Sequence, residues 1–205
     1  MEPMYQYLDA VLNRSVGFTP KKILDIGAWN GYWTLNCKNI WPDAHYTCIE
    51  AGQKHSKNLE LVADEHYIEV LGDTNKTTTM YLNHRIKPNG KVKPIYSKGA
   101  NIFGGYEHSE QREMKTLGSV VGADARYDFI KQDVQGAEIK IIQGSIDIFQ
   151  RATYILNEVN IDKVNKMLPS FDEMNAYMSN IGFTKHEIVA EHPEPNRQYD
   201  VLYYK

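Results

Sequence analysis

Cysteine, long apolar runs and an excess of basic charge are all scarce in this chain of 205 residues. Its two cysteines, Cys37 and Cys48, form no Cys-x-x-Cys motif, and such cysteines are typical of small core residues in a reducing compartment. No apolar run reaches the roughly 18 residues that a bilayer-crossing helix needs. The segment 1–13 lacks the basic-then-apolar order of a signal peptide. We therefore expect a cytoplasmic protein with no membrane span.

The overall composition is that of an ordinary globular protein. Hydrophobic residues make up 42% of the chain, charged residues 24%, and the net charge is −3. A chain of this length can bury a proper core as one domain, here 1–205. No global basic field attracts a nucleic acid, so nucleic acid is not an expected partner.

Short apolar segments alternate with segments of helical spacing along most of the chain. This order predicts an α/β fold with a mostly parallel sheet and right-handed crossovers. The turn-rich link at 192–196 predicts that the last two strands form an antiparallel hairpin. The expected strands are 21–27, 45–50, 66–71, 127–133, 153–159, 183–190 and 199–204, and the expected helices are 4–12, 32–41, 54–63, 137–148 and 171–181.

The segment 74–126 interrupts this alternation between the third and fourth parallel strands. It is too long for one crossover helix, and long insertions of this kind often carry function. Alternation predicts strands at 77–82 and 112–117, a turn at 87–90 and a glycine-rich stretch at 101–106. We expect this insertion to shape the binding site for a substrate.

A glycine loop follows the first predicted strand, in the sequence Leu-Asp-Ile-Gly-Ala-Trp-Asn-Gly at 24–31. Gly27 permits the tight strand-to-helix turn, and a Cβ-free position lets a ligand approach the backbone. Glu50 ends the next strand, where an acidic residue can accept hydrogen bonds from ribose hydroxyls. The loop predicts a nucleoside-containing ligand. The expected contacts are Asp25, Gly27, Ala28, Trp29, Gly31, Glu50 and Ala51.

The spacing of the loop distinguishes between two ligands. A dinucleotide loop needs Gly-x-Gly-x-x-Gly, whereas Trp29 stands here in place of the second glycine and would block a pyrophosphate. S-adenosylmethionine (SAM) has no phosphate, so the loop favours SAM. Two alternatives to a SAM-binding loop remain: the loop of a nicotinamide-dependent oxidoreductase, and a purely structural turn. Gly72 and Asp73 end the predicted third strand, where Asp73 could accept the adenine amino group or simply form a turn.

A second motif, Lys-Gln-Asp-Val-Gln-Gly-Ala-Glu at 131–138, closes the fourth predicted parallel strand. It resembles the Lys-Ile-Asp-Val-Glu-Gly-Ala-Glu signature of the FkbM family of methyltransferases. The resemblance extends over about 21–160 and includes the glycine loop, Gly72-Asp73 and 157–159, although Gln135 replaces the usual glutamate. It implies a Rossmann-like class I methyltransferase fold with a seven-stranded sheet, and SAM-dependent O-methylation of a hydroxyl of a sugar or glycan.

Two carboxylates are the candidate catalytic groups. An alcohol is a poor nucleophile near neutral pH, so a general base or a bound cation helps to remove its proton. Asp133 is the expected base and also a donor contact, with Glu158 on the neighbouring strand in support. Together they could instead hold Mg²⁺ or Mn²⁺. The alternatives are that Asp133 only caps a helix, that Glu158 is a solvated strand end, and that Glu138 serves only the helix dipole.

Three further hypotheses remain open from the sequence. His108, in the insertion, is either a second candidate base or a surface residue. A basic loop could attract a phosphorylated or nucleotide-linked acceptor, or be a solvated hairpin tip. Replacement of the signature glutamate by Gln135 also leaves open a catalytically silent SAM-binding partner subunit. The basic loop comprises Arg85, Lys87, Lys91, Lys93 and Lys98.

Overall fold

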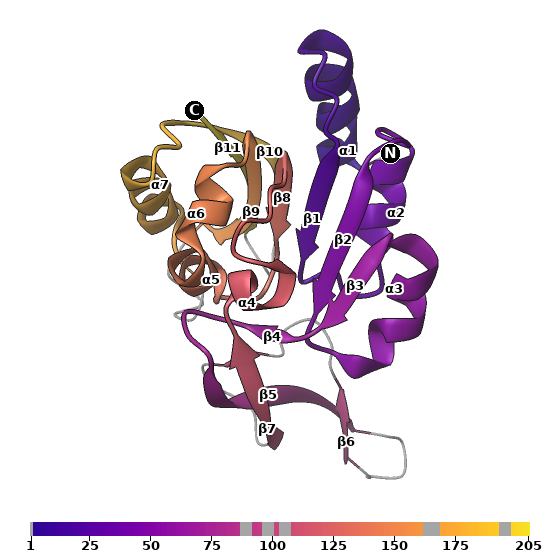
Figure 1. Cartoon of the computed structure of the whole chain (residues 1–205), viewed down its shortest axis with the longest axis vertical. Helices are drawn as coiled ribbons and strands as arrows, with labels where there is room; N and C mark the ends of the chain where they lie inside the picture. The colour runs from indigo at the N-terminus through magenta and orange to yellow at the C-terminus, as the bar shows by residue number, and fades with distance from the viewer. Residues whose placement is uncertain (1, 87–91, 96–100, 103–107, 162–168, 193–197) are drawn as a thin grey trace.

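Two β-sheets with flanking helices form the computed structural model of the chain (Figure 1). It describes residues 2–86, 92–95, 101–102, 108–161, 169–192 and 198–205, with the backbone alone at 83–86 and 92–95. The larger sheet has seven strands in the order β10-β11-β9-β8-β1-β2-β3. Its strands are β1 (Lys22–Ile26), β2 (His45–Glu50), β3 (Glu65–Ile68), β8 (Phe129–Gln132), β9 (Tyr154–Asn160), β10 (Lys185–His192) and β11 (Gln198–Tyr204).

The larger sheet confirms the predicted class I outline. Strands β3, β2, β1, β8 and β9 run parallel to one another. The predicted hairpin is present, and β11 lies between β9 and β10, antiparallel to both. The carboxyl ends of the parallel strands therefore share one edge of the sheet, where ligands bind in folds of this kind.

Helices cover both faces of the larger sheet (Figure 1). Consecutive residues of β1 face opposite sides, so Ile23 packs with the N-terminal helices and Leu24 with the C-terminal ones. Ser145 divides the single helix predicted at 137–148 into two, with its hydroxyl accepting a hydrogen bond from Gly118 N at 2.8 Å. The helices are α1 (Pro3–Tyr7), the π-helix η1 (Leu8–Ser15), α2 (Tyr32–Lys38), the 3₁₀-helix η2 (Gln53–His55), α3 (Ser56–Val62), α4 (Leu117–Val121), α5 (Glu138–Gly144), α6 (Ile146–Gln150) and α7 (Phe171–Asn180).

A smaller four-stranded sheet, in the order β4-β7-β5-β6, lies beyond the carboxyl ends of the parallel strands (Figure 1). It contains most of the described part of the insertion. The strand predicted at 77–82 is confirmed, and the one predicted at 112–117 begins earlier and ends before Leu117, which starts α4. The strands are β4 (Val70–Leu71), β5 (Lys76–Ile86), β6 (Val92–Ile95) and β7 (His108–Lys115).

The strand predicted at 66–71 is wrong in its second half. The chain leaves the larger sheet at Glu69, whose carboxylate lies 2.7 Å from the ammonium of Lys115 on β7. Val70 then packs in the core of the smaller sheet beside Met80 and Met114. Gly72 and Asp73 therefore follow β4, which pairs with β7, and do not end the third strand of the larger sheet. Among the described residues, no helix is both long and apolar enough to cross a membrane.

Candidate active site

The glycine loop connects β1 to α2 and is fixed by close packing within the protein. Gly27 has φ +74°, and a Cβ at this position would lie 1.9 Å from the carbonyl oxygen of Asp133. Gly31 has φ +81°, and its Cβ would lie 2.4 Å from a methyl of Val62. Both glycines are thus explained by backbone conformation and internal contacts. The contact at Gly27 brings the turn after β1 directly against the turn after β8.

The backbone amides of Gly27, Ala28, Trp29 and Gly31 in the loop are already occupied by partners within the protein. Phosphate-binding loops work by presenting several free N–H groups to the ligand. Here Trp29 N donates to Oε2 of Glu50 at 2.9 Å. The other donors are Gly27 N and Ala28 N to Ile49 O, Gly31 N to Ala28 O, and Tyr32 N to Oδ1 of Asn30. This arrangement fits a ligand without a pyrophosphate.

Glu50 is oriented by backbone donors at the carboxyl end of β2. Its two carboxylate oxygens accept from Trp29 N at 2.9 Å and from Gly52 N at 2.7 Å. Each oxygen keeps a second lone pair that can accept from a hydroxyl. Burial raises the pKa of Glu50 above its usual range, and the two backbone hydrogen bonds oppose that rise. The Trp29 ring beside it is 42% exposed, and the carbonyl of Ala51 accepts from Arg112 at 3.1 Å.

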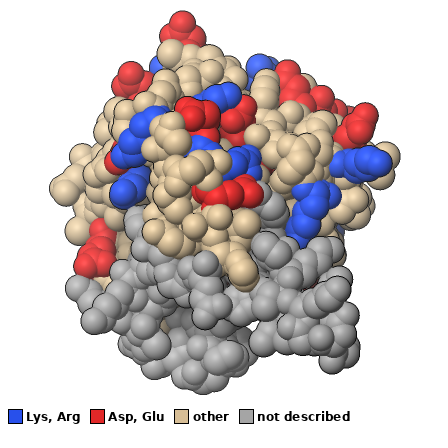
Figure 2. Space-filling view, turned by 90° about the horizontal axis from the view of Figure 1, so that it is seen from below, with Lys and Arg blue, Asp and Glu red and all other residues tan. Residues whose placement is uncertain are grey.

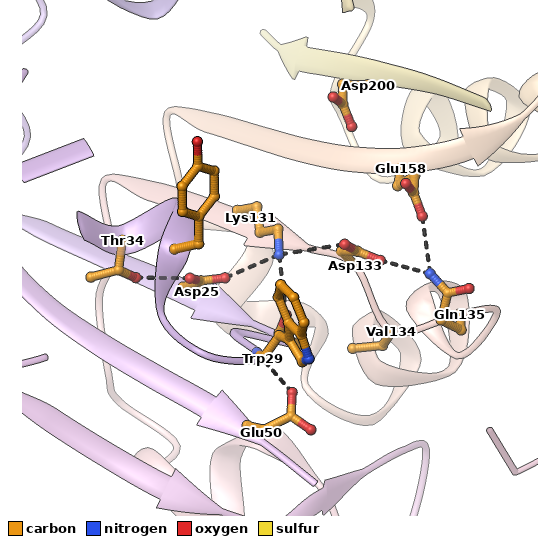
Figure 3. A network of polar contacts seen from close by, with 12 residues as sticks. Asp25, Trp29, Thr34, Glu50, Lys131, Asp133, Val134, Gln135, Glu158 and Asp200 are labelled. Carbon is orange, nitrogen blue, oxygen red and sulfur yellow. Dashed lines mark hydrogen bonds and ion pairs between the residues drawn. The ribbon is translucent and has the colours of Figure 1, made fainter. Parts of the chain in front are cut away.

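A buried lysine connects the glycine loop to the second motif (Figure 3). The ammonium of Lys131 lies 3.2 Å from Oδ1 of Asp25, 3.2 Å from the carbonyl oxygen of Gly27 and 3.8 Å from Oδ2 of Asp133. Asp25 is fully buried and also accepts from Thr34 at 2.8 Å. Burial disfavours the charged lysine, but Asp25 and Asp133 together raise its pKa above the usual range. Asp25 thus lies beneath the loop, and Lys131 connects it to Asp133 in the turn after β8.

Lys131 is the first residue of the second motif, but its role in the site was not predicted from the sequence. A lysine directly after the apolar residues Phe129 and Ile130 of β8 is the signal that could have identified it. The register of β1 and β8 places Asp25 directly beside Lys131. Only the strand order reveals this pairing, because the two residues are far apart in the sequence.

Gln135 bridges the two candidate catalytic carboxylates. Its side-chain Nε2 donates to Oδ1 of Asp133 at 2.9 Å and to Oε2 of Glu158 at 3.1 Å (Figure 3). Gln135 has φ +58°, a conformation that costs a non-glycine residue about 1 kcal/mol or more. The bridging amide therefore lies in a strained turn that fixes both carboxylates.

The alternatives for Asp133 and Glu158 can now be tested. The residue that caps α5 is Ala137, so the suggestion that Asp133 caps this helix is wrong. Glu158 accepts from both Gln135 and Gln198 and is not a freely solvated strand end. Burial, followed by the nearby charge of Asp133, raises the pKa of Glu158 well above its usual range.

Glu138 has a structural role in the same turn. It is fully buried, and its Oε1 accepts from Val134 N at 3.0 Å and Gly136 N at 3.3 Å. It therefore holds the turn that carries Asp133 and Gln135, which is more than an interaction with the helix dipole. Burial raises the pKa of Glu138 to about 7.

This pKa predicts how stability responds to pH. The pKa of Glu138 is higher in the folded protein than its ordinary value of 4.5, so the free energy of unfolding falls as the pH rises between these values. Glu138→Gln keeps an acceptor oxygen without the charge. We expect it to match the wild type near pH 4.5 and to be more stable at pH 8, by up to about 3 kcal/mol. Urea unfolding of both proteins across pH 4.5–8 measures this, and parallel curves would contradict it.

The remaining predicted site residues are more widely placed. Gly72 and Asp73 lie against the end of α5, where a Cβ on Gly144 would be 2.5 Å from the carbonyl oxygen of Gly72. The carboxylate of Asp73 lies 3.5 Å from the ammonium of Lys76. His108 begins β7 in the smaller sheet. Lys87, Lys91 and Lys98 of the basic loop, and the side chains of Arg85 and Lys93, lie outside the described residues, as do the turn at 87–90 and most of the glycine-rich stretch.

The surface at this end of the molecule carries charges of both signs. Seen from below, acidic and basic side chains are interleaved across the described part of the surface (Figure 2). Beneath this surface, Lys131 is largely buried, whereas 35% of the side chain of Asp133 is exposed. A recognition surface of mixed charge and hydrogen-bonding groups suits a polar ligand.

The sequence profile of the FkbM methyltransferase domain matches residues 25–185, which include all of the glycine loop except Leu24, the whole second motif, and the strands from the end of β1 to β9. The chain belongs to the FkbM family of methyltransferases. It is therefore a methyltransferase by family, and SAM is the donor that this assignment implies. No curated protein matches the chain.

Solved structures share the fold of this FkbM-family chain at low identity. The N-terminal domain of EvdMO1 with S-adenosylhomocysteine (SAH) bound has a TM-score of 0.54 and 11% identity, over 100% of this chain and 81% of that one. A provisionally assigned O-methyltransferase from Klebsiella pneumoniae has a TM-score of 0.52 and 12% sequence identity, over 98% of this chain and 78% of that one. A provisionally assigned O-methyltransferase from Nostoc punctiforme has a TM-score of 0.50 and 14% sequence identity, over 98% of this chain and 55% of that one. The chain thus spans about half the length of the Nostoc protein.

Proposed function

We propose that this FkbM-family chain transfers the methyl group of SAM to a hydroxyl of a sugar or glycan, with Asp133 as the general base. The observation that carries the proposal is the position of Asp133. Lys131 and Gln135 hold this carboxylate at the carboxyl end of β8, in the turn whose backbone packs on Gly27. About a third of its side chain, 35%, is exposed.

The chemistry needs alignment and one proton acceptor. SAM supplies an electrophilic methyl group on a sulfonium, and the bond to sulfur breaks as the bond to the acceptor oxygen forms. In the proposal, Glu50 accepts hydrogen bonds from the ribose hydroxyls, and Asp73 recognises the adenine. Asp133 takes the proton of the acceptor hydroxyl. Lys131 and Gln135 are positioning residues that fix the carboxylate.

The base role is favoured over a metal held by Asp133 and Glu158. The Nε2 donor of Gln135 lies within hydrogen-bond distance of both carboxylates. An amide N–H donates to carboxylates and is not a ligand that Mg²⁺ or Mn²⁺ prefers. This side chain would have to turn away before a cation could bind between the two.

The acceptor class is proposed from the family and from one neighbouring fold. The EvdMO1 domain was also solved in the presence of SAH and D-fucose, with a TM-score of 0.53 and 10% identity. In this chain the smaller sheet lies beyond the proposed donor site, where it could line an acceptor pocket (Figure 1). The phosphorylated or nucleotide-linked form of the acceptor remains part of the proposal.

Titration calorimetry tests the donor assignment. We expect SAM and SAH to bind at micromolar concentration and NAD not to bind, because the loop amides are already occupied. Glu50→Ala should weaken SAH binding by about tenfold or more, the value of one or two hydrogen bonds to a charged group. Glu65→Ala, an exposed carboxylate at the start of β3, is the matched control. Binding of NAD without binding of SAM or SAH would contradict the proposal and favour a nicotinamide-dependent oxidoreductase.

Methyl transfer to sugars tests the reaction itself. Labelled methyl groups are followed from SAM to a panel of free, phosphorylated and nucleotide-linked sugars, with the wild type and Asp133→Ala. The proposal expects turnover that the variant loses. Tight SAH binding without turnover on any hydroxyl acceptor would favour the silent partner subunit instead.

A further inference from the structure

Three strands at one end of the larger sheet bring together two carboxylates and an imidazole. Glu158 on β9, His192 on β10 and Asp200 on β11 each offer one ligand atom, and these atoms all lie within 4.8 Å of one another. From this geometry we propose that Glu158, His192 and Asp200 form a binding site for a divalent transition-metal cation. None of the sequence motifs points to His192 or Asp200.

The strand register explains why these side chains converge. Glu158 lies directly opposite Asp200 in the antiparallel pair of β9 and β11. His192 lies opposite Gln198, two residues from Asp200 and on the same face of the sheet. Side chains directly opposite and diagonally displaced on antiparallel strands are within reach of each other. The three ligands therefore come from a rigid sheet rather than from loops.

Glu158 and Asp200 would repel each other if both were ionised, and a cation between them would relieve that repulsion. Like charges directly opposite on antiparallel strands destabilise a sheet, and Glu158 faces Asp200 in this way. His192 Nε2 lies 2.9 Å from Oδ2 of Asp200, so one of the two atoms carries a proton in this pair. A bound cation would replace that proton and neutralise both carboxylates.

The donor set selects the kind of metal. Mg²⁺ prefers oxygen ligands throughout, whereas an imidazole beside two carboxylates suits Mn²⁺, Fe²⁺ or Zn²⁺. Gln198, itself 8% exposed, donates to Oε2 of Glu158 at 3.1 Å and holds that ligand in place. The side chain of His192 is 44% exposed and that of Asp200 is 14% exposed, so a cation can enter from the His192 side.

The site also touches the proposed reaction centre. Glu158 is held by Gln135, whose amide also holds Asp133 (Figure 3). A cation bound to Glu158 would thus lie beside the carboxylate that accepts the proton, where it could attract a polar acceptor. Only this link to methyl transfer rests on the proposed function, because the cation site itself depends on the three ligands alone.

Metal binding is measured without any reaction. Protein dialysed against a chelator is titrated with Mn²⁺, and the loss of the free Mn²⁺ signal is followed by electron paramagnetic resonance. We expect one saturable site per chain, and at least about tenfold weaker binding in His192→Ala and in Asp200→Asn. His45→Ala is the matched control, because His45 lies 3.8 Å from Glu65 and no third ligand joins this pair within the described part of the chain. It should bind Mn²⁺ as the wild type does.

Two results would overturn the cation site: no saturable binding by the wild type, or unchanged affinity in both His192→Ala and Asp200→Asn. Circular dichroism of each variant checks that it is folded, and Asp200→Asn provides a nearly isosteric second test. SAH titration of the same samples separates the two proposals. Mn²⁺ binding without SAH binding would contradict the proposed donor and support the cation site. SAH binding without Mn²⁺ binding would support the donor and overturn the cation site.

Discussion

Asp133→Asn is expected to lower the rate of methyl transfer by about 10²–10⁴-fold, the usual contribution of a general base. Asparagine has the same shape and keeps an oxygen that can accept from Gln135, but it cannot take up the proton of the acceptor. SAH affinity should stay close to that of the wild type, because in the proposed arrangement the glycine loop and Glu50 hold the donor. Single-turnover kinetics with labelled SAM and calorimetry with SAH measure the two quantities.

The matched control for this loss is Asp43→Asn, at an exposed aspartate in the turn before β2. It should leave both the rate and the affinity unchanged. A rate in Asp133→Asn within a few fold of the wild type would remove Asp133 as the base. An equal loss of SAH affinity would instead make it a donor-binding residue.

Lys131→Met is expected to lower the free energy of unfolding by about 3–5 kcal/mol, the cost of leaving one member of a buried ion pair alone. Methionine fills a similar volume without the ammonium. Asp25, which is fully buried, would then keep only its hydrogen bond from Thr34. Urea denaturation followed by circular dichroism measures the loss.

A double-mutant cycle separates charge from packing in this result. Asp25→Asn combined with Lys131→Met removes both charges, so the double variant should recover a large part of the stability lost in Lys131→Met. If the double variant loses the sum of the two single losses, the pair has no coupling and the argument from burial is wrong. SAH binding of the double variant then shows whether Lys131 also orients the loop.

Most of the larger sheet could be predicted because strands such as β1, β2 and β9 are short, largely apolar runs with turn residues between them and their neighbours in sequence. The glycine loop and the second motif were identified for the same reason, since each is a local pattern. The prediction that Gly72 and Asp73 end the third strand of the larger sheet was wrong, because the residues before them are apolar in either sheet. Only the ion pair between Glu69 and Lys115 and the packing of Val70 show where the chain leaves the larger sheet.

Contacts between distant strands could not be predicted from local patterns. Asp25 meets Lys131, and Glu158 meets Asp200, only because β1 pairs with β8 and β9 pairs with β11. Neither pairing leaves a local signature in the sequence. The bridging role of Gln135 likewise depends on a left-handed turn that glutamine rarely adopts.

The order of synthesis places a constraint on how this sheet can assemble. β11 is the last strand to leave the ribosome, and in the larger sheet it lies between β9 and β10 and pairs with both. Until β11 has emerged, the edge of β9 has no partner, and an unpaired apolar strand edge invites association with other chains. The nascent chain is therefore prone to association with other chains until β11 inserts between β9 and β10.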